Sequence, residues 1–181
     1  MKGRDEALRL LAEADPLYGE KEVRTAVERM AVEISARLGN EFPVVLSVMG
    51  GAAIFTGQLL PLLHFPLEFG AIEVTRYNND IQGREITWRL PPRDNVRGRT
   101  VLVIDDILDE GITLAAIVKR VSEMGALKVM SAVFCDKQIG RPKPVAADFV
   151  GVTVPNRYVF GFGMDAYGLW RNLPGVYALK D

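Results

Sequence analysis

The sequence contains a single cysteine, Cys135, and a single histidine, His64. One thiol excludes a disulfide within the chain, and so few sulfur and imidazole ligands argue against a zinc site built from them. The absence of disulfides is typical of a reducing compartment, so we expect a cytoplasmic protein. We interpret Cys135 as a buried strand residue and His64 as a structural residue.

The sequence also lacks a charge surplus and a long apolar segment. Its 22 basic and 23 acidic residues give a net charge of −1, whereas nucleic-acid binding usually requires a clustered basic surface. The first residues contain no apolar stretch of the kind that a secretory signal needs, and the longest apolar runs are too short to span a membrane. We therefore expect neither nucleic acid nor a membrane as a partner.

The 181 residues do contain alternating helical and extended patterns. Apolar periodicity and glycine or proline punctuation predict helices over residues 5–14, 19–38, about 52–63 and 112–124, and strands over residues 44–49, 67–75, 85–90, 101–104, 128–135 and 148–154. Strands that alternate with helices predict right-handed βαβ units and a parallel sheet. We expect a five-stranded parallel α/β core with helices on both faces.

Residues 101–114 form the most informative segment of the sequence. Four apolar residues predict a buried strand that delivers Asp105 and Asp106 to the carboxyl edge of the sheet, where open α/β sheets bind ligands. A short loop from Asp109 to Thr113 then leads into a helix, whose unpaired N–H groups and positive dipole end favour an anion. The segment therefore predicts a phosphate site.

This segment resembles the phosphoribosyl pyrophosphate (PRPP) motif of type I phosphoribosyltransferases, and within them of the hypoxanthine-guanine enzymes, over about residues 44–175. The family pattern is four apolar residues, two acids, two apolar residues, then Asp-Thr-Gly and a nearby Thr. The resemblance implies the type I fold, a twisted parallel sheet flanked by helices with a small hood. It also implies one domain over residues 1–181, with a core of about 40–154 and a hood of about 155–181 plus part of the N-terminal region.

By the same resemblance, Asp105 and Asp106 hold the ribose hydroxyls and neighbour Mg²⁺. The 5′-phosphate is cradled by Asp109, Glu110, Gly111, Ile112 and Thr113. Asp109 is also the general base near N7 of a purine, a role that suits a carboxylate. Glu110 departs from the usual Thr or Ser, and its charge is unfavourable beside a phosphate unless the side chain turns outward.

The resemblance places the purine near residues 137–165. Tyr158 stacks on the base, and backbone groups of Val159 and Asp165 contact its edge. Asp165 also binds a second Mg²⁺. Lys137 donates to O6, which selects 6-oxopurines because an amino group there would leave the lysine unpaired.

Three further elements complete the implied site. Met49 and Gly50 lie in the pyrophosphate loop, with a strained peptide expected between Val48 and Met49, and the family often has Lys where this chain has Met49. Arg171 binds pyrophosphate through its planar charged fork. The loop 76–84, with Arg76 and Tyr77, forms a lid that excludes water from the reaction.

The implied function is purine salvage, the Mg²⁺-dependent transfer of phosphoribose from PRPP to hypoxanthine or guanine by a homodimer or homotetramer. Taken singly, an Asp pair is more often a loop feature, and Lys137, Tyr158 and Arg171 are more often surface or core residues. Two alternatives stay open: a regulator on the same fold that binds nucleotides or nucleic acid, and a phosphoribosyltransferase for xanthine, adenine or uracil.

Overall fold

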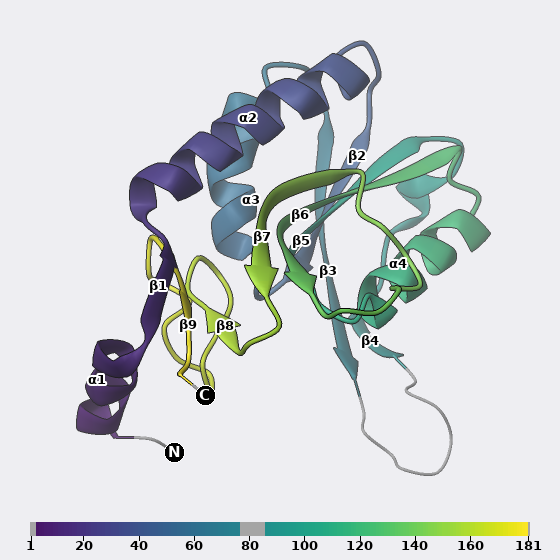
Figure 1. The fold of residues 1–181 in the computed structure, drawn as a ribbon. Helices are drawn as coiled ribbons and strands as arrows, with labels where there is room; N and C mark the ends of the chain where they lie inside the picture. Colours follow the sequence, from purple (N-terminus) through teal and green to yellow (C-terminus); the bar gives the residue numbers. More distant parts are fainter. Residues whose placement is uncertain (1–2, 77–85, 181) are drawn as a thin grey trace.

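The described residues of the protein form two β-sheets, a large mixed sheet and a small antiparallel one (Figure 1). The computed structural model describes residues 3–76 and 86–180. The helices are α1 (Arg4–Glu13), α2 (Glu20–Leu38), α3 (Ala53–Leu59) and α4 (Ile112–Glu123), with short 3₁₀ helices at Leu60–Leu62 and Asp94–Val96. The strands are β1 (Asp15–Tyr18), β2 (Val44–Met49), β3 (Glu68–Arg76), β4 (Ile86–Leu90), β5 (Thr100–Leu108), β6 (Lys128–Gln138), β7 (Phe149–Pro155), β8 (Val159–Phe160) and β9 (Val176–Ala178).

The large sheet has the strand order β4-β3-β2-β5-β6-β7. Its strands β3, β2, β5, β6 and β7 run parallel, which confirms the predicted five-stranded parallel core. β4 adds a sixth strand at the edge and pairs with β3 in the antiparallel direction. The alternating pattern of residues 85–90 suits such an edge position, because an antiparallel edge strand has one face open to water.

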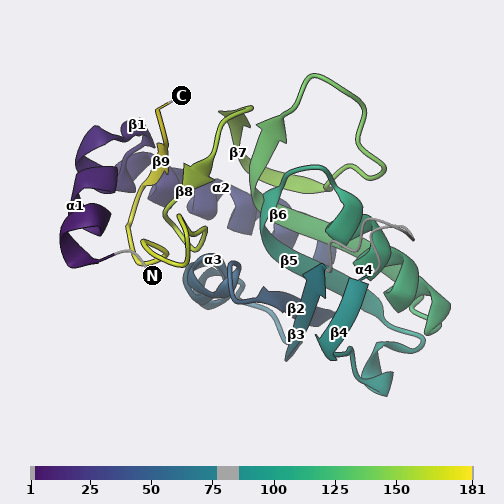
Figure 2. The ribbon, with the colours of Figure 1, turned by 90° about the horizontal axis from the view of Figure 1, so that it is seen from below.

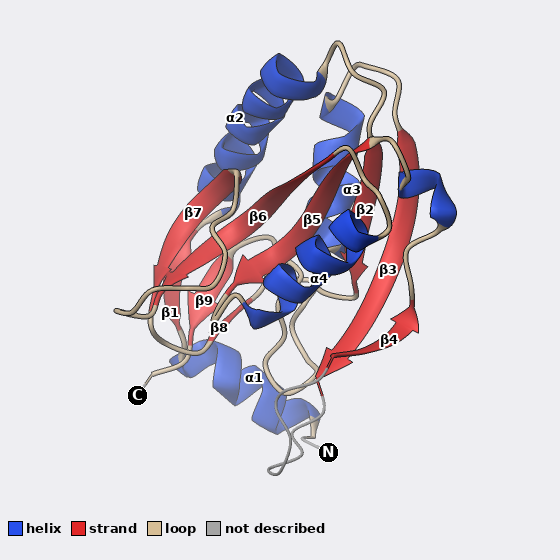
Figure 3. Cartoon of the chain, turned by 90° about the vertical axis from the view of Figure 1, so that its right-hand side faces the viewer, coloured by secondary structure: helices blue, strands red, loops and turns tan. Residues whose placement is uncertain are grey.

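Helices cover both faces of the large sheet, as the sequence predicts. In Figure 3, α4 lies in front of the sheet and α2 and α3 lie behind it. The alternation of side chains along β5 serves both layers: Leu102 and Ile104 pack in the core under α2 and α3, and Val101 and Val103 pack in the core under α4. This explains why residues 101–104 of the strand are all apolar instead of alternating with polar residues.

β5 and β6 are longer than the sequence predicts. β5 continues past Ile104 to Leu108, and β6 continues past Cys135 to Gln138, because the two strands stay paired through Leu108 and Asp136. Backbone hydrogen bonds between parallel strands do not depend on the polarity of the side chains, so the length of the apolar run underestimates the length of the strand. Asp105 and Asp106 consequently lie within β5, not after its end.

The small antiparallel sheet, in the order β1-β9-β8, forms the hood. Figure 2 shows that the hood and α1 lie to one side of the large sheet. The Arg157 guanidinium ties its strands together by donating to Asp15 Oδ2 and to the Leu179 carbonyl, each at 2.7 Å. The Trp170 indole donates to the Ala7 carbonyl at 3.0 Å and anchors α1 to the hood. Within the described residues, no helix combines the length and apolar character that a membrane crossing would need.

Candidate active site

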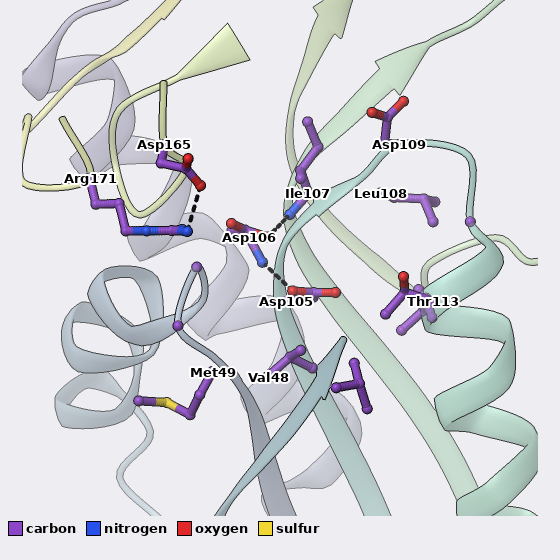
Figure 4. Close-up of a pocket in the computed structure, with 15 residues that line it drawn as sticks. Val48, Met49, Asp105, Asp106, Ile107, Leu108, Asp109, Thr113, Asp165 and Arg171 are labelled. Carbon is purple, nitrogen blue, oxygen red and sulfur yellow. Dashed lines mark hydrogen bonds and ion pairs between the residues drawn. The ribbon is translucent and has the colours of Figure 1, made fainter. Parts of the chain in front are cut away.

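A cavity of about 440 Å³ opens where the carboxyl end of the large sheet faces the hood (Figure 4). The end of β2, the end of β5, the first turn of α4 and the hood all contribute to its wall. It brings together most of the residues that the sequence assigns to PRPP, namely Met49, Gly50, Asp105, Asp106, Asp109, Gly111, Thr113, Asp165 and Arg171. Glu110 and Ile112 are absent from the residues that line it.

The two consecutive carboxylates at the centre of the cavity are fixed by backbone donors. The Asp106 N–H donates to Asp105 Oδ1 at 3.0 Å, and the Ile107 N–H donates to Asp106 Oδ1 at 2.8 Å. Burial raises the pKa of the Asp106 carboxyl, and the hydrogen bond from Ile107 and the positive charge of Arg171 oppose that rise. A partly desolvated acidic pair of this kind suits the hydroxyl groups of a sugar or a cation.

Two glycines allow the core and the hood to approach these carboxylates. A Cβ on Gly51 would overlap Oδ2 of Asp106, and a Cβ on Gly163, which has a φ of +103°, would overlap the Gly51 carbonyl. Both positions therefore require a residue without a side chain. The sequence places Gly51 between a strand and a helix, in the loop that the resemblance assigns to pyrophosphate, but it does not indicate the close approach at Gly51 or at Gly163.

The loop that the resemblance assigns to pyrophosphate contains a cis peptide, but between Met49 and Gly50. The expectation of a strained peptide between Val48 and Met49 is wrong by one residue. A cis peptide brings consecutive Cα atoms to about 2.9 Å, and the pair that includes a glycine has one Cβ fewer to accommodate. The Met49 side chain is 38% exposed.

The proposed phosphate loop turns directly into α4. Gly111 occupies the N-cap position with a φ of +80°, which favours glycine, and its carbonyl accepts the Ala115 N–H at 2.9 Å. By helix geometry, the first N–H groups of α4 have no acceptor inside the helix and point toward the loop. Glu110 turns away from the cavity, and its carboxylate meets Arg141 at 2.6 Å. The sequence did not single out Arg141, because 31 residues separate the partners.

A second cavity, of about 260 Å³, adjoins the first and shares Asp106, Ile107, Asp109 and Asp165 with it. It contains every residue that the sequence assigns to the purine, since Lys137, Tyr158 and Val159 also line it. The Lys137 ammonium group lies 2.8 Å from Asp109 Oδ2, with only 12% of the lysine side chain exposed. A carboxylate and a cation thus face one small cavity beside a larger polar one.

Tyr158 presents an exposed aromatic ring, 46% accessible, to this second cavity. It also stacks on Tyr167, with ring centroids 5.6 Å apart and planes 17° from parallel. Tyr167 has a φ of +56° in the same hood loop as Asp165. The sequence does not single out Tyr167, whose only signal is that an aromatic residue stands two positions after Asp165.

Asp165 and Arg171 bind each other across the hood loop. Their side chains meet at 2.5 Å, and a dashed line marks this ion pair in Figure 4. The Gly168 N–H donates to the other carboxylate oxygen of Asp165 at 2.7 Å, and Arg171 also donates to the Gly163 carbonyl at 2.6 Å. The proposed metal ligand and the proposed pyrophosphate ligand are therefore held as one unit.

The arrangement of the acidic residues suits Mg²⁺ better than a cation whose ligands all come from the protein. Among residues 3–76 and 86–180, no three His, Cys, Asp or Glu side chains gather into a metal-binding group. Mg²⁺ is commonly held by one or two carboxylates together with substrate phosphates and water. Asp105, Asp106 and Asp165 line the large cavity from opposite sides and match that pattern.

The remaining residues that the sequence singles out either fall outside the described residues or have structural surroundings. Tyr77 and most of the lid loop 76–84 fall outside the described residues, as does the side chain of Arg76, the last residue of β3. His64 is an exposed residue whose ring bonds the Pro61 carbonyl at 3.1 Å. Cys135 is fully buried on β6, and burial raises the pKa of its thiol, as expected of a structural residue.

An open α/β sheet with cavities at the carboxyl ends of its strands has the architecture of nucleotide-binding α/β proteins. The sequence model of the phosphoribosyl transferase domain matches residues 7–167. The chain therefore belongs to the phosphoribosyltransferase family, and it is an enzyme of that class.

Named relatives and solved structures agree with this assignment. The chain is 32% identical over 165 residues to the hypoxanthine-guanine phosphoribosyltransferase of Bacillus subtilis, covering 91% of this chain and 92% of the relative. It is 31% identical to the hypoxanthine-guanine-xanthine phosphoribosyltransferase of Tritrichomonas foetus, covering 91% of each. A hypoxanthine phosphoribosyltransferase of Trypanosoma cruzi superposes with a TM-score of 0.86 at 26% identity, covering 93% of this chain and 97% of that one.

Proposed function

We propose that this protein salvages purines by transferring the 5-phosphoribosyl group of PRPP to hypoxanthine or guanine, releasing pyrophosphate. The observation that carries the proposal is the Asp109–Lys137 pair, which lies at the junction of the two cavities. The large polar cavity suits a sugar that carries a phosphate and a pyrophosphate, and the small cavity beside Tyr158 suits a planar base. The two relatives described above bear names that specify hypoxanthine and guanine.

In this reaction, N9 of the base forms a bond to C1′ of the ribose while the bond from C1′ to pyrophosphate breaks. The proton on N7 leaves as the new bond forms, and Asp109 accepts or shares it. Lys137 donates to O6 and holds Asp109 in position through the 2.8 Å contact. The carboxylates of Asp105 and Asp106 hold the ribose hydroxyls and stabilise positive charge that develops at C1′.

Asp105 and Asp106 are the residues that would hold one Mg²⁺, and Asp165 would hold a second. When bound, the ions neutralise charge on the pyrophosphate leaving group. The first-turn amides of α4, with Gly111 and Thr113, bind the 5′-phosphate. Because Glu110 is engaged with Arg141, only its backbone N–H is assigned to this phosphate.

The direct test is pyrophosphate release with PRPP, Mg²⁺ and a panel of hypoxanthine, guanine, xanthine, adenine and uracil. We expect turnover with hypoxanthine or guanine and none with adenine or uracil. Turnover with adenine alone would contradict the role of Lys137. Turnover with xanthine tests the alternative of a xanthine phosphoribosyltransferase, because xanthine differs from guanine only at position 2.

Lys137→Ala should reduce kcat/KM for hypoxanthine by about tenfold to a hundredfold, since a charge-assisted hydrogen bond to O6 contributes about 1.5–3 kcal/mol. The measurement is steady-state kinetics with varied base at saturating PRPP. Lys119→Ala is the matched control, because that side chain is 77% exposed on α4. Unchanged kinetics in Lys137→Ala would leave the lysine with a structural role.

Tyr158→Ala should raise the KM for the base by about fivefold to a hundredfold, because stacking on an aromatic ring contributes about 1–3 kcal/mol per base. Tyr158→Phe keeps the ring and should behave like the wild type. Both variants are compared at saturating PRPP, with the KM for PRPP as an internal reference. A loss confined to PRPP would place Tyr158 outside the base site.

We also propose a single phosphoribosyltransferase domain, a cytoplasmic location and self-association as a homodimer or homotetramer. The buried, unpaired Cys135 thiol is consistent with a reducing compartment. For the T. cruzi relative, the C-terminal region has been examined for its role in the oligomeric state. Light scattering coupled to size exclusion distinguishes a monomer from the proposed oligomers.

A further inference from the structure

The connection between β6 and β7, residues 139–148, packs against the outer side of the phosphate loop. Its Lys143 ammonium group donates to the Leu108 carbonyl at 2.6 Å and meets Asp136 Oδ1 at 2.5 Å. Leu108 and Asp136 form the last register pair between β5 and β6, at the end of β5 and two residues before the end of β6. One cation thus joins the last paired residues of two adjacent strands.

The residues next to this bridge carry the proposed chemistry. Leu108 directly precedes Asp109, and Asp136 directly precedes Lys137. Those two side chains lie 2.8 Å apart and line the small cavity, whereas Lys143 lines neither of the two cavities described above. Lys143 therefore contacts the strand ends that hold the Asp109–Lys137 pair without access to the substrates.

The Lys143–Asp136 ion pair is largely shielded from solvent, so the loss of either partner should be costly. Only 13% of the Lys143 side chain and 26% of the Asp136 side chain are exposed, so the pair is substantially desolvated. Removing one partner of such a pair leaves the other charge uncompensated, which is more costly than losing an exposed ion pair. The Leu108 carbonyl would lose a charge-assisted hydrogen bond in the same change.

The rest of the connection supports the phosphate loop at two more points. A Cβ on Gly111 would lie 3.2 Å from Pro144 Cδ and 3.4 Å from Lys143 Cβ, so the connection sits directly against the N-cap of α4. Arg141 holds the Glu110 carboxylate at 2.6 Å. The loop between β5 and α4 is thus held from outside by contacts on three successive parts of the connection.

We propose that Lys143 is a positioning residue, which fixes Asp109 relative to Lys137 by joining the ends of β5 and β6. The proposal rests on the proposed function for its catalytic consequence, but its structural content is independent of any substrate. A misplacement of about 1 Å at a reacting group costs about a hundredfold in rate. Loss of Lys143 should therefore lower kcat more than it weakens the binding of PRPP.

The test compares Lys143→Met with Lys119→Met, the same replacement at an exposed position of α4. We expect Lys143→Met to lower kcat by about tenfold to a hundredfold with a KM for PRPP near the wild-type value, and to shift the acidic limb of the kcat–pH profile. Lys143→Arg should restore part of the rate because it keeps the charge.

Asp136→Asn should mimic Lys143→Met. The double variant should be no worse than either single variant, because each single substitution already removes the same ion pair.

Hydrogen exchange separates this inference from the proposed function. Amides of residues 107–113 should exchange faster in Lys143→Met than in the wild type and in Lys119→Met, while amides of β2 keep their protection. If the wild type releases no pyrophosphate with any base, the proposed function fails, and exchange still decides whether Lys143 braces the loop. Unchanged exchange in residues 107–113, or additive losses in the double variant, would overturn the inference. A fall in melting temperature with faster exchange throughout the protein would also overturn it, since Lys143 would then be generally stabilising.

Discussion

Asp109→Asn should lower kcat by about a hundredfold to ten-thousandfold, the range for loss of a general acid–base group, while PRPP still binds. The carboxylate lines both cavities, so it is in reach of the ribosyl centre and of the base. Asparagine has nearly the same shape and keeps an oxygen acceptor for Lys137. It has no carboxylate to take the proton that leaves N7, so the variant removes the chemistry and preserves the geometry.

The measurement pairs steady-state kinetics with calorimetric titration of PRPP and Mg²⁺. Asp94→Asn, at an exposed position that lines neither of the two cavities, is the control for the loss of one negative charge. Full activity in Asp109→Asn would remove the residue from the role of base. Loss of PRPP binding along with the rate would instead assign the carboxylate to the sugar phosphate.

The parallel core could be predicted because apolar runs and glycine turns are local signals. The run Val101–Ile104 marked β5, and its continuation to Leu108 was hidden because pairing with β6, not side-chain polarity, keeps those residues extended. The hood strands were missed for a related reason. β8 and β9 contain only two and three residues, and they exist through pairing with each other and with β1.

The residues of the candidate site also differ in whether a local signal marks them. Asp105, Asp106 and the loop 109–113 belong to one family motif, and Lys137 stands near the end of a predicted strand, so the sequence indicates them. Arg141, Lys143 and Tyr167 were missed because each acts through a partner distant in sequence or through ring stacking. Contacts of that kind depend on how separate elements pack, and a single sequence has no periodicity that encodes them.

Because Gly51 lies so close to Asp106, replacing this glycine with alanine should have a large effect on the site. A Cβ at position 51 would overlap Asp106 Oδ2, and Asp106 has little freedom to withdraw because its other oxygen accepts the Ile107 N–H. The Gly51 backbone cannot easily retreat either, since its carbonyl lies against Gly163 of the hood. The added methyl group must therefore rotate the carboxylate that we assign to the ribose hydroxyls or separate the hood from the core.

We expect Gly51→Ala to weaken PRPP binding by about a hundredfold, comparable to misplacing a site group by 1 Å, and to destabilise the fold by about 1–3 kcal/mol through overpacking. Gly57→Ala is the matched control. Gly57 lies inside α3 with nothing within 4 Å of an added Cβ, and alanine should stabilise that helix by about 0.5–1 kcal/mol. Calorimetry with PRPP and denaturant unfolding of both variants measure the two effects separately. Normal PRPP affinity in a folded Gly51→Ala variant would show that the Asp106 carboxylate is not needed in its observed position, and its assignment to the ribose would have to be withdrawn.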